Sequence, residues 1–167
     1  MRFIVDCMLG KLAKWLKILG FDTLYFSRID DNALLSRAAA EDRTLLTRDT
    51  GLLERARAGS RVSSLFIRSE NWEDQVVQVL DDFDLRRHIR RHTRCIDCNV
   101  KLEDLARTRA RNLVAPFIYQ KSKSFALCPL CGRVFWRGTH FRDMDIKLDE
   151  ILGRQEEAES TRSHEGG

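Results

Sequence analysis

The first half of the chain alternates short apolar runs with segments of helical periodicity. Residues 2–5 form the first apolar run, and Leu9, Leu12, Leu16 and Leu19 follow at the spacing of one helix face. Gly20 then ends this helix. The same alternation continues, so we predict further strands at about 23–26, 44–47 and 63–67, and further helices at about 31–39, 51–58, 71–80 and 84–91.

Strands separated by helices of this length predict parallel crossover units. Right-handed crossovers place helices on both faces of one sheet, so the fold class we expect is an α/β protein with a three-layer arrangement around a parallel sheet. In such sheets ligands bind beyond the carboxyl ends of the strands, where the strand order reverses. Residues that follow the strands are therefore the first candidates for a site.

Acidic residues follow three of the predicted strands. Asp6 comes directly after the first strand, Asp49 two residues after the third, and Asp30 and Asp31 in the loop after the second. Clustered carboxylates repel one another, and an all-oxygen set suits Mg²⁺ or Mn²⁺. The alternative is that these residues only form turns and cap helices, which would explain Asp30 or Asp31 well.

The second half of the chain contains two C-x-x-C pairs separated by 29 residues. Four thiolates in this arrangement fit a structural Zn²⁺, with a redox role for either pair as the weaker alternative. The long separation predicts a helix at about 102–111 and a strand at about 114–119 between the pairs. The zinc ligands we predict are Cys95, Cys98, Cys128 and Cys131.

Charge is distributed unevenly along the chain. Residues 1–85 carry 12 basic and 14 acidic side chains, residues 86–142 carry 14 and 3, and residues 143–167 carry 3 and 8. A central block with a net charge of +11 would attract a polyanion, and its aromatic residues suit single-stranded or looped RNA. The aromatics could equally form the core of a small ribbon. The candidate RNA contacts in this block are Arg107, Arg109, Arg111, Lys121, Lys123, Arg137 and His140.

Overall composition is that of an ordinary globular protein, with 43% hydrophobic and 32% charged residues. The longest apolar runs are about five residues, against roughly 20 for a membrane span, so we expect a soluble cytoplasmic protein with no membrane partner. The domains we predict are a first domain at 1–91, a basic zinc ribbon at 92–150 and a disordered acidic tail at 151–167.

Several segments together resemble a known family, the RNase domain found at the C-terminus of the mutator-seven exonuclease and as free-standing prokaryotic proteins. The resemblance covers roughly residues 1–150. It depends on Phe3-Ile4-Val5-Asp6, on the segments 9–16 and 19–22, on Leu45-Leu46-Thr47-Arg48-Asp49, on the two C-x-x-C pairs and on Trp136-Arg137-Gly138-Thr139-His140.

The resemblance implies a PIN-like nuclease domain followed by a zinc ribbon, with Mg²⁺ or Mn²⁺ held by strand-end aspartates and RNA as the substrate. In PIN-like nucleases the first acid closes the first strand and another ends a Thr-x-Asp motif, which match Asp6 and Asp49 here. The intermediate acid matches the pair Asp30 and Asp31, of which Asp31 is slightly favoured. PIN-like sites often include a fourth acid near the later strands, and no clear one follows Ile67 here, which weakens the case for two catalytic metals over one.

The resulting hypothesis is a metal-dependent ribonuclease in which these aspartates hold Mg²⁺ or Mn²⁺ and a water molecule attacks an RNA phosphodiester. Lys11, Lys14 and Arg48 would contact neighbouring phosphates. The alternative is a non-catalytic RNA-binding zinc-ribbon protein in which the acids are helix caps. An aspartyl phosphatase is weaker still, because Met8 stands where the second acid of such a motif is expected.

Overall fold

The computed structural model describes residues 1–58 and 62–162, and the side chains as far as Gly153. The chain divides into two compact units, Met1–Leu102 and Glu103–Gly167. No helix within the described ranges is long and apolar enough to cross a membrane.

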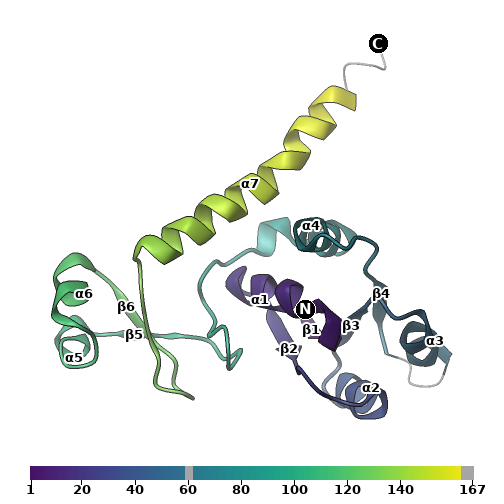
Figure 1. Cartoon of the computed structure of the whole chain (residues 1–167), viewed down its shortest axis with the longest axis horizontal. Helices are drawn as coiled ribbons and strands as arrows, with labels where there is room; N and C mark the ends of the chain where they lie inside the picture. Colours follow the sequence, from purple (N-terminus) through teal and green to yellow (C-terminus); the bar gives the residue numbers. More distant parts are fainter. Residues whose placement is uncertain (59–61, 163–167) are drawn as a thin grey trace. The chain divides into compact units, whose positions relative to one another are not determined.

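Strands and helices alternate in the first unit (Figure 1). In chain order they are β1 (Arg2–Val5), the 3-10 turn η1 (Cys7–Leu9), α1 (Gly10–Ile18), β2 (Asp22–Tyr25), α2 (Asp31–Ala40), β3 (Thr44–Thr47), α3 (Thr50–Ala58), β4 (Ser64–Phe66), α4 (Trp72–Asp82) and the 3-10 turn η2 (Arg86–His88).

The four strands form one parallel sheet in the order β2-β1-β3-β4. Ile4 and Leu45 face α2 and α3 and pack there with Leu34 and Leu52 in one buried cluster. The alternation of side chains turns the neighbouring apolar residues of β1 and β3 to the opposite face. The α/β fold predicted from the sequence, a parallel sheet flanked by helices, is thus confirmed.

The strand order also locates the reversal point of the sheet. β2 lies on one side of β1 and β3 lies on the other, so the strand order reverses between β1 and β3 although all the strands are parallel. The carboxyl ends of these two strands therefore form the crevice in which α/β proteins bind ligands. Asp6 follows one of these strands and Asp49 the other.

The second unit contains a three-stranded antiparallel sheet in the order β5-β6-β7. Its core includes Leu105 and Phe125, with Tyr119 and Trp136 packed against them. Its elements are β5 (Glu103–Leu105), α5 (Arg107–Ala110), α6 (Pro116–Lys121), β6 (Phe125–Leu127), β7 (Val134–Trp136) and α7 (Thr139–Arg162).

Some sequence predictions were wrong. The segment expected as a strand at 114–119 is largely the helix α6, because Pro116 occupies the first turn, where its fixed φ and missing N–H favour a helix start. The helix expected at 102–111 is β5 followed by the short α5. The helix expected at 84–91 is only the turn η2, since Asp84 has a φ of +50° after α4.

The acidic tail expected to be disordered at 151–167 is helical as far as Arg162, where α7 ends. Residues 163–167 lie outside the described residues. The scarcity of apolar residues in this tail does not prevent a helix, because charged residues such as Glu and Arg have high helix propensity.

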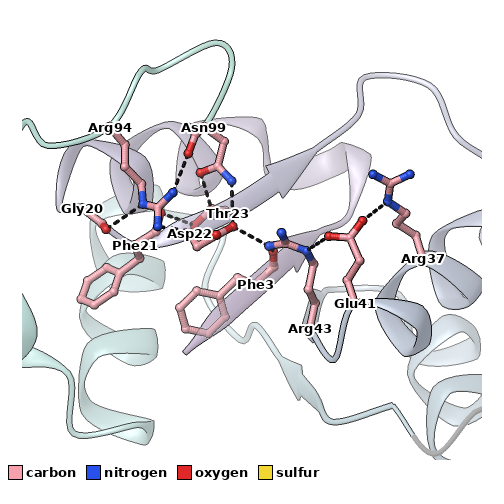
Figure 2. A network of polar contacts seen from close by, with 10 residues as sticks. All are labelled: Phe3, Gly20, Phe21, Asp22, Thr23, Arg37, Glu41, Arg43, Arg94 and Asn99. Atoms are coloured by element: carbon pink, nitrogen blue, oxygen red, sulfur yellow. Dashed lines mark hydrogen bonds and ion pairs between the residues drawn. The ribbon is translucent and has the colours of Figure 1, made fainter. Parts of the chain in front are cut away.

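A polar network joins β2 to the segment that carries the first C-x-x-C pair (Figure 2). Asp22 Oδ1 accepts hydrogen bonds from Arg43 Nη1 at 2.6 Å and from Asn99 Nδ2 at 2.8 Å. Asn99 Oδ1 in turn accepts from the backbone N of Thr23 at 2.9 Å. Because β2 is an edge strand, Asn99 satisfies a backbone donor that the sheet leaves open.

Asp22 is the central acceptor of this network. Burial alone would disfavour its charged form, but the hydrogen bonds from Arg43 and Asn99 more than offset this effect, and the pKa of Asp22 lies below its usual value. Arg43 is only 7% exposed and pairs with Glu41 at 2.7 Å as well as with Asp22, so loss of Asp22 would leave this buried cation with one carboxylate partner instead of two.

We expect Asp22→Asn to lower the free energy of unfolding by about 2 kcal/mol near neutral pH, the scale of hydrogen bonds to charged groups. A depressed carboxyl pKa stabilises the folded state above the unfolded-state pKa of about 3.9. This stabilisation is lost as the pH falls through the folded-state pKa. The difference between variant and wild type in urea unfolding should therefore shrink below about pH 4.

Asp84→Asn is the matched control, because Asp84 pairs with Arg87 at the surface, where both side chains are exposed. We expect a change below about 0.5 kcal/mol for this control. An effect of Asp22→Asn that is no larger than that of the control would contradict the structural role of the network.

Candidate functional site

Asp6 lies at the carboxyl end of β1, where the β1–β3 register places it beside Thr47. Val5 pairs with Leu46, and the backbone N of Asp6 donates to Leu46 O at 3.0 Å. Thr47 Oγ1 donates a hydrogen bond to Asp6 Oδ2 at 2.9 Å. Asp6 is 7% exposed and Thr47 is fully buried, so this carboxylate is held in a fixed orientation.

Asp49 is held by the same threonine. Its backbone N donates to Thr47 Oγ1 at 2.9 Å, and its side-chain Oδ1 accepts from the backbone N of Leu52 at 2.9 Å. Asp49 therefore caps the start of α3, which agrees with the alternative that these acids are helix caps. It also lies at the same sheet edge as Asp6. One hydroxyl group thus contacts the carboxylate of Asp6 and the backbone of Asp49, while the backbone N of Leu52 holds the Asp49 carboxylate.

Asp30 and Asp31 have different surroundings. Asp30 caps α2, since its Oδ1 accepts from the backbone N of Ala33 at 3.0 Å, so a capping role accounts for this residue. Asp31 Oδ2 accepts from Arg55 Nη1 at 2.6 Å. Sequence reasoning missed Arg55, because only the packing of α3 beside α2 shows that this cation reaches Asp31.

The pKa of the Cys7 thiol is raised by the acidic residues around it. A hydrogen bond with the side chain of Asp6, then burial, and then the charges of Asp6 and Asp31 raise the pKa of the Cys7 thiol above its usual value. The charge of Asp31 thus reaches the segment that carries Asp6. The structure places Asp6 and Asp49 at the carboxyl ends of β1 and β3, where the Thr47 hydroxyl contacts both, while Asp31 begins α2 after β2 and pairs with Arg55.

The acids do not form a closed ligand cage. Among the described residues, one group of three or more Cys, His, Asp or Glu side chains is close enough to share a metal ion. This group consists of the four cysteines. Mg²⁺ commonly keeps several water ligands and uses only one or two carboxylates. The oxygen donors of Asp6 and Asp49 fit such a partly hydrated ion.

The four predicted zinc ligands form one compact group. Their sulfur atoms all lie within 4.8 Å of one another, and such a set suits a tetrahedral ion such as Zn²⁺. The members are Cys95, Cys98, Cys128 and Cys131.

Both C-x-x-C pairs have the same local geometry. The backbone N of Cys98 donates to Cys95 Sγ, and the backbone N of Cys131 donates to Cys128 Sγ, each at 3.5 Å. The residue after each pair has a left-handed backbone, with φ of +62° at Asn99 and +71° at Gly132. Asn and Gly are the residues that adopt this conformation at low cost, so the local sequence supports the turn.

Lys17 is buried although it lies outside the apolar stripe that Leu9, Leu12, Leu16 and Leu19 form on α1. It is 6% exposed, and its Nζ donates to Ile96 O at 2.9 Å. Burial lowers its pKa, while the charges of Asp97, Cys95 and Cys98 act in the opposite direction. Lys17 therefore supports the first C-x-x-C segment with a buried positive charge.

The candidate RNA contacts fall into two groups. Arg107 is engaged within its own unit, where it donates to Ser122 O and Tyr119 O and lies 4.2 Å from the centre of the Tyr119 ring. Arg48 donates to Ser69 O and pairs with Glu70 at 3.1 Å. The exposed candidates are Lys11, Lys14, Arg109, Arg111, Lys121, Lys123, Arg137 and His140.

Three of the six aromatic residues in the basic block, residues 86–142, belong to the core of the second unit, which favours a structural role for these three. Phe125 is buried, and Tyr119 and Trp136 pack against it. Phe117 differs, since 62% of it is exposed.

The fold and the cysteine group together define an α/β protein that carries acidic residues at the switch point of its sheet and a zinc-ribbon type of metal group. The family model described as the Mut7-C RNAse domain matches residues 1–148, and the chain belongs to this family. The family description indicates a nuclease of the RNase type, with RNA as the substrate. No curated protein and no solved structure matches the chain.

We expect the purified protein to contain about one zinc ion per chain by elemental analysis. Cys131→Ser should lower both the zinc content and the midpoint of thermal unfolding, because metal binding contributes to folding. Cys7→Ser is the matched control, since Cys7 lies outside the four-cysteine group. Equal zinc content in the two variants would contradict the assignment.

Proposed function

We propose that the chain is a metal-dependent ribonuclease whose site is centred on Asp6. The observation that carries this proposal is the Thr47 hydroxyl, which contacts the Asp6 carboxylate and the Asp49 backbone at the switch point of the sheet. Membership of a family described as an RNase domain supports RNA as the substrate.

In this proposal Asp6 and Asp49 hold Mg²⁺ or Mn²⁺, with Asp31 as a further ligand directly or through water. The ion would lower the pKa of a bound water molecule and stabilise charge on the phosphate. Attack of the water oxygen on phosphorus would break the bond to the leaving ribose oxygen, which would take up the proton that the water gives up. Exposed Lys11 and Lys14 on α1 would neutralise phosphates along the bound strand.

The second candidate function is RNA binding without cleavage. It is supported by the capping roles of Asp30 and Asp49 and by the exposed cations of the second unit. Only a cleavage assay separates it from the ribonuclease.

We expect Asp6→Asn to reduce Mn²⁺-supported cleavage of single-stranded RNA by about a hundredfold or more, because the amide keeps the shape and removes the charge. Added Mn²⁺ should be compared with no addition rather than with a chelator, which would also remove zinc. Glu54→Gln, an exposed change on α3, is the control and should cleave at the wild-type rate. Unaltered cleavage by Asp6→Asn would contradict the proposal.

Thr47→Val removes the hydroxyl while keeping the shape of the side chain. It should weaken Mn²⁺ binding about 10- to 100-fold, the usual effect of losing a partner that orients metal ligands. Thr47→Ser should restore most of the affinity, because the hydrogen bonds can form again. Titration calorimetry gives the affinities, and equal weakening by both variants would show that Thr47 acts through packing instead.

A further inference from the structure

A pocket of about 710 Å³ opens beside the candidate catalytic edge. It lies between the start of α1 and the start of α4, and Tyr25 at the end of β2 also lines it. Cys7 is both a wall residue of the pocket and the neighbour of Asp6. The lining consists of residues 7–11, 70–73 and 75 together with Tyr25.

Two aromatic side chains of this pocket are held rigidly. The Tyr25 hydroxyl donates to Cys7 O at 3.0 Å, and a Cβ atom on Gly10 would lie only 2.8 Å from that hydroxyl oxygen. Gly10 therefore allows the ring to lie against the start of α1. Trp72 is stacked on Trp15, with ring centres 4.8 Å apart and planes at 10°.

The pocket offers an apolar surface as well as these rings. Met8 is 72% exposed, so its thioether is accessible in the lining of the pocket. Rigid aromatic rings and an exposed thioether favour a flat, apolar ligand such as a nucleobase, because every base can stack through its face.

The charged groups of the pocket indicate which part of a nucleotide it would accept. Glu70 and Glu73 line it together with one cation, Lys11, and Glu70 also pairs with Arg48, which is not part of the lining. Two carboxylates disfavour a phosphate inside the pocket, but they are good acceptors for the amino groups of bases. Lys14 lies one turn beyond Lys11 on α1 and is exposed, so phosphates can be neutralised outside the pocket.

We propose that this pocket binds one base of the RNA strand next to the bond that is cleaved, and that it prefers bases carrying an amino group to uracil. The proposal deepens the proposed function and rests on it for the identity of the strand. Tyr25 and Trp72 would contact the base, and Glu73 would accept a hydrogen bond from its amino group.

The test uses nucleoside monophosphates, which contain no bond to cleave and need no added metal ion. We would titrate the full chain with AMP, CMP, GMP, UMP and ribose 5-phosphate, and follow the Trp72 indole N–H by NMR, assigned with Trp72→Phe. CMP, AMP and GMP should bind about fivefold or more tightly than UMP. This ratio is at the low end of the discrimination between bases that a good side-chain contact to a base edge provides.

Glu73→Gln should remove most of this preference while the rings still support weak binding. Trp72→Ala should weaken all four nucleotides, and Trp72→Phe should restore part of the affinity. Because these two variants lack the Trp72 indole, their binding is followed through the backbone amide of Gly10, which also lines the pocket. The control is again Glu54→Gln, which lies on α3 away from the pocket lining. If Trp72→Ala does not fold, the comparison of Glu73→Gln with its control still decides the preference.

Equal binding of all nucleotides and ribose 5-phosphate would overturn the proposal, since it would indicate a phosphate site. Absence of any Trp72 shift at about 10 mM nucleotide, a very weak affinity, would overturn it as well. Cleavage of RNA by the wild type is measured separately. If the wild type cleaves RNA but the nucleotides bind without base preference, only the proposal for the pocket is contradicted. If the nucleotides bind with base preference but RNA is not cleaved, the pocket is supported and the ribonuclease proposal is contradicted.

Discussion

The parallel pairing of β1 with β3 is the constraint on which the candidate site depends. Its register places Asp6 beside Thr47, and the Thr47 hydroxyl then links Asp6 to the backbone of Asp49. Because β2 lies on the other side of β1, this pairing also creates the switch point of the sheet. The hydrogen bonds of Thr47 therefore connect the strand pairing of the sheet with the candidate metal ligands.

Buried charge holds the segment with the first C-x-x-C pair in place within the first unit. Lys17 donates to Ile96 O, Asn99 donates to Asp22, and Arg94 Nη1 donates to Asn99 O at 2.6 Å. These groups are costly to bury, so the contacts favour one arrangement of the segment over alternatives. Gly20 adds to this constraint, because a Cβ there would lie 2.2 Å from Arg90 O.

Local patterns predicted much of this structure. The strands of the first unit, the four cysteines and the acids at strand ends follow from periodicity and spacing. Non-local contacts could not be predicted: the pairing of Arg55 with Asp31, the burial of Lys17 and the use of Arg107 within its own unit depend on which elements pack together. The segment around Pro116 is a helix and not the predicted strand, because proline at the helix start outweighs the apolar content of the residues that follow it.

The most direct test of the account is to locate a divalent ion on the protein. Mn²⁺ broadens NMR signals of nearby nuclei, so substoichiometric Mn²⁺ should first broaden the backbone amides of Asp6, Cys7 and Asp49. This broadening should be absent in Asp6→Asn. If Mn²⁺ left these amides unaffected, or broadened them equally in Asp6→Asn, the carboxyl edge of the sheet would not be a metal site and the account would be contradicted.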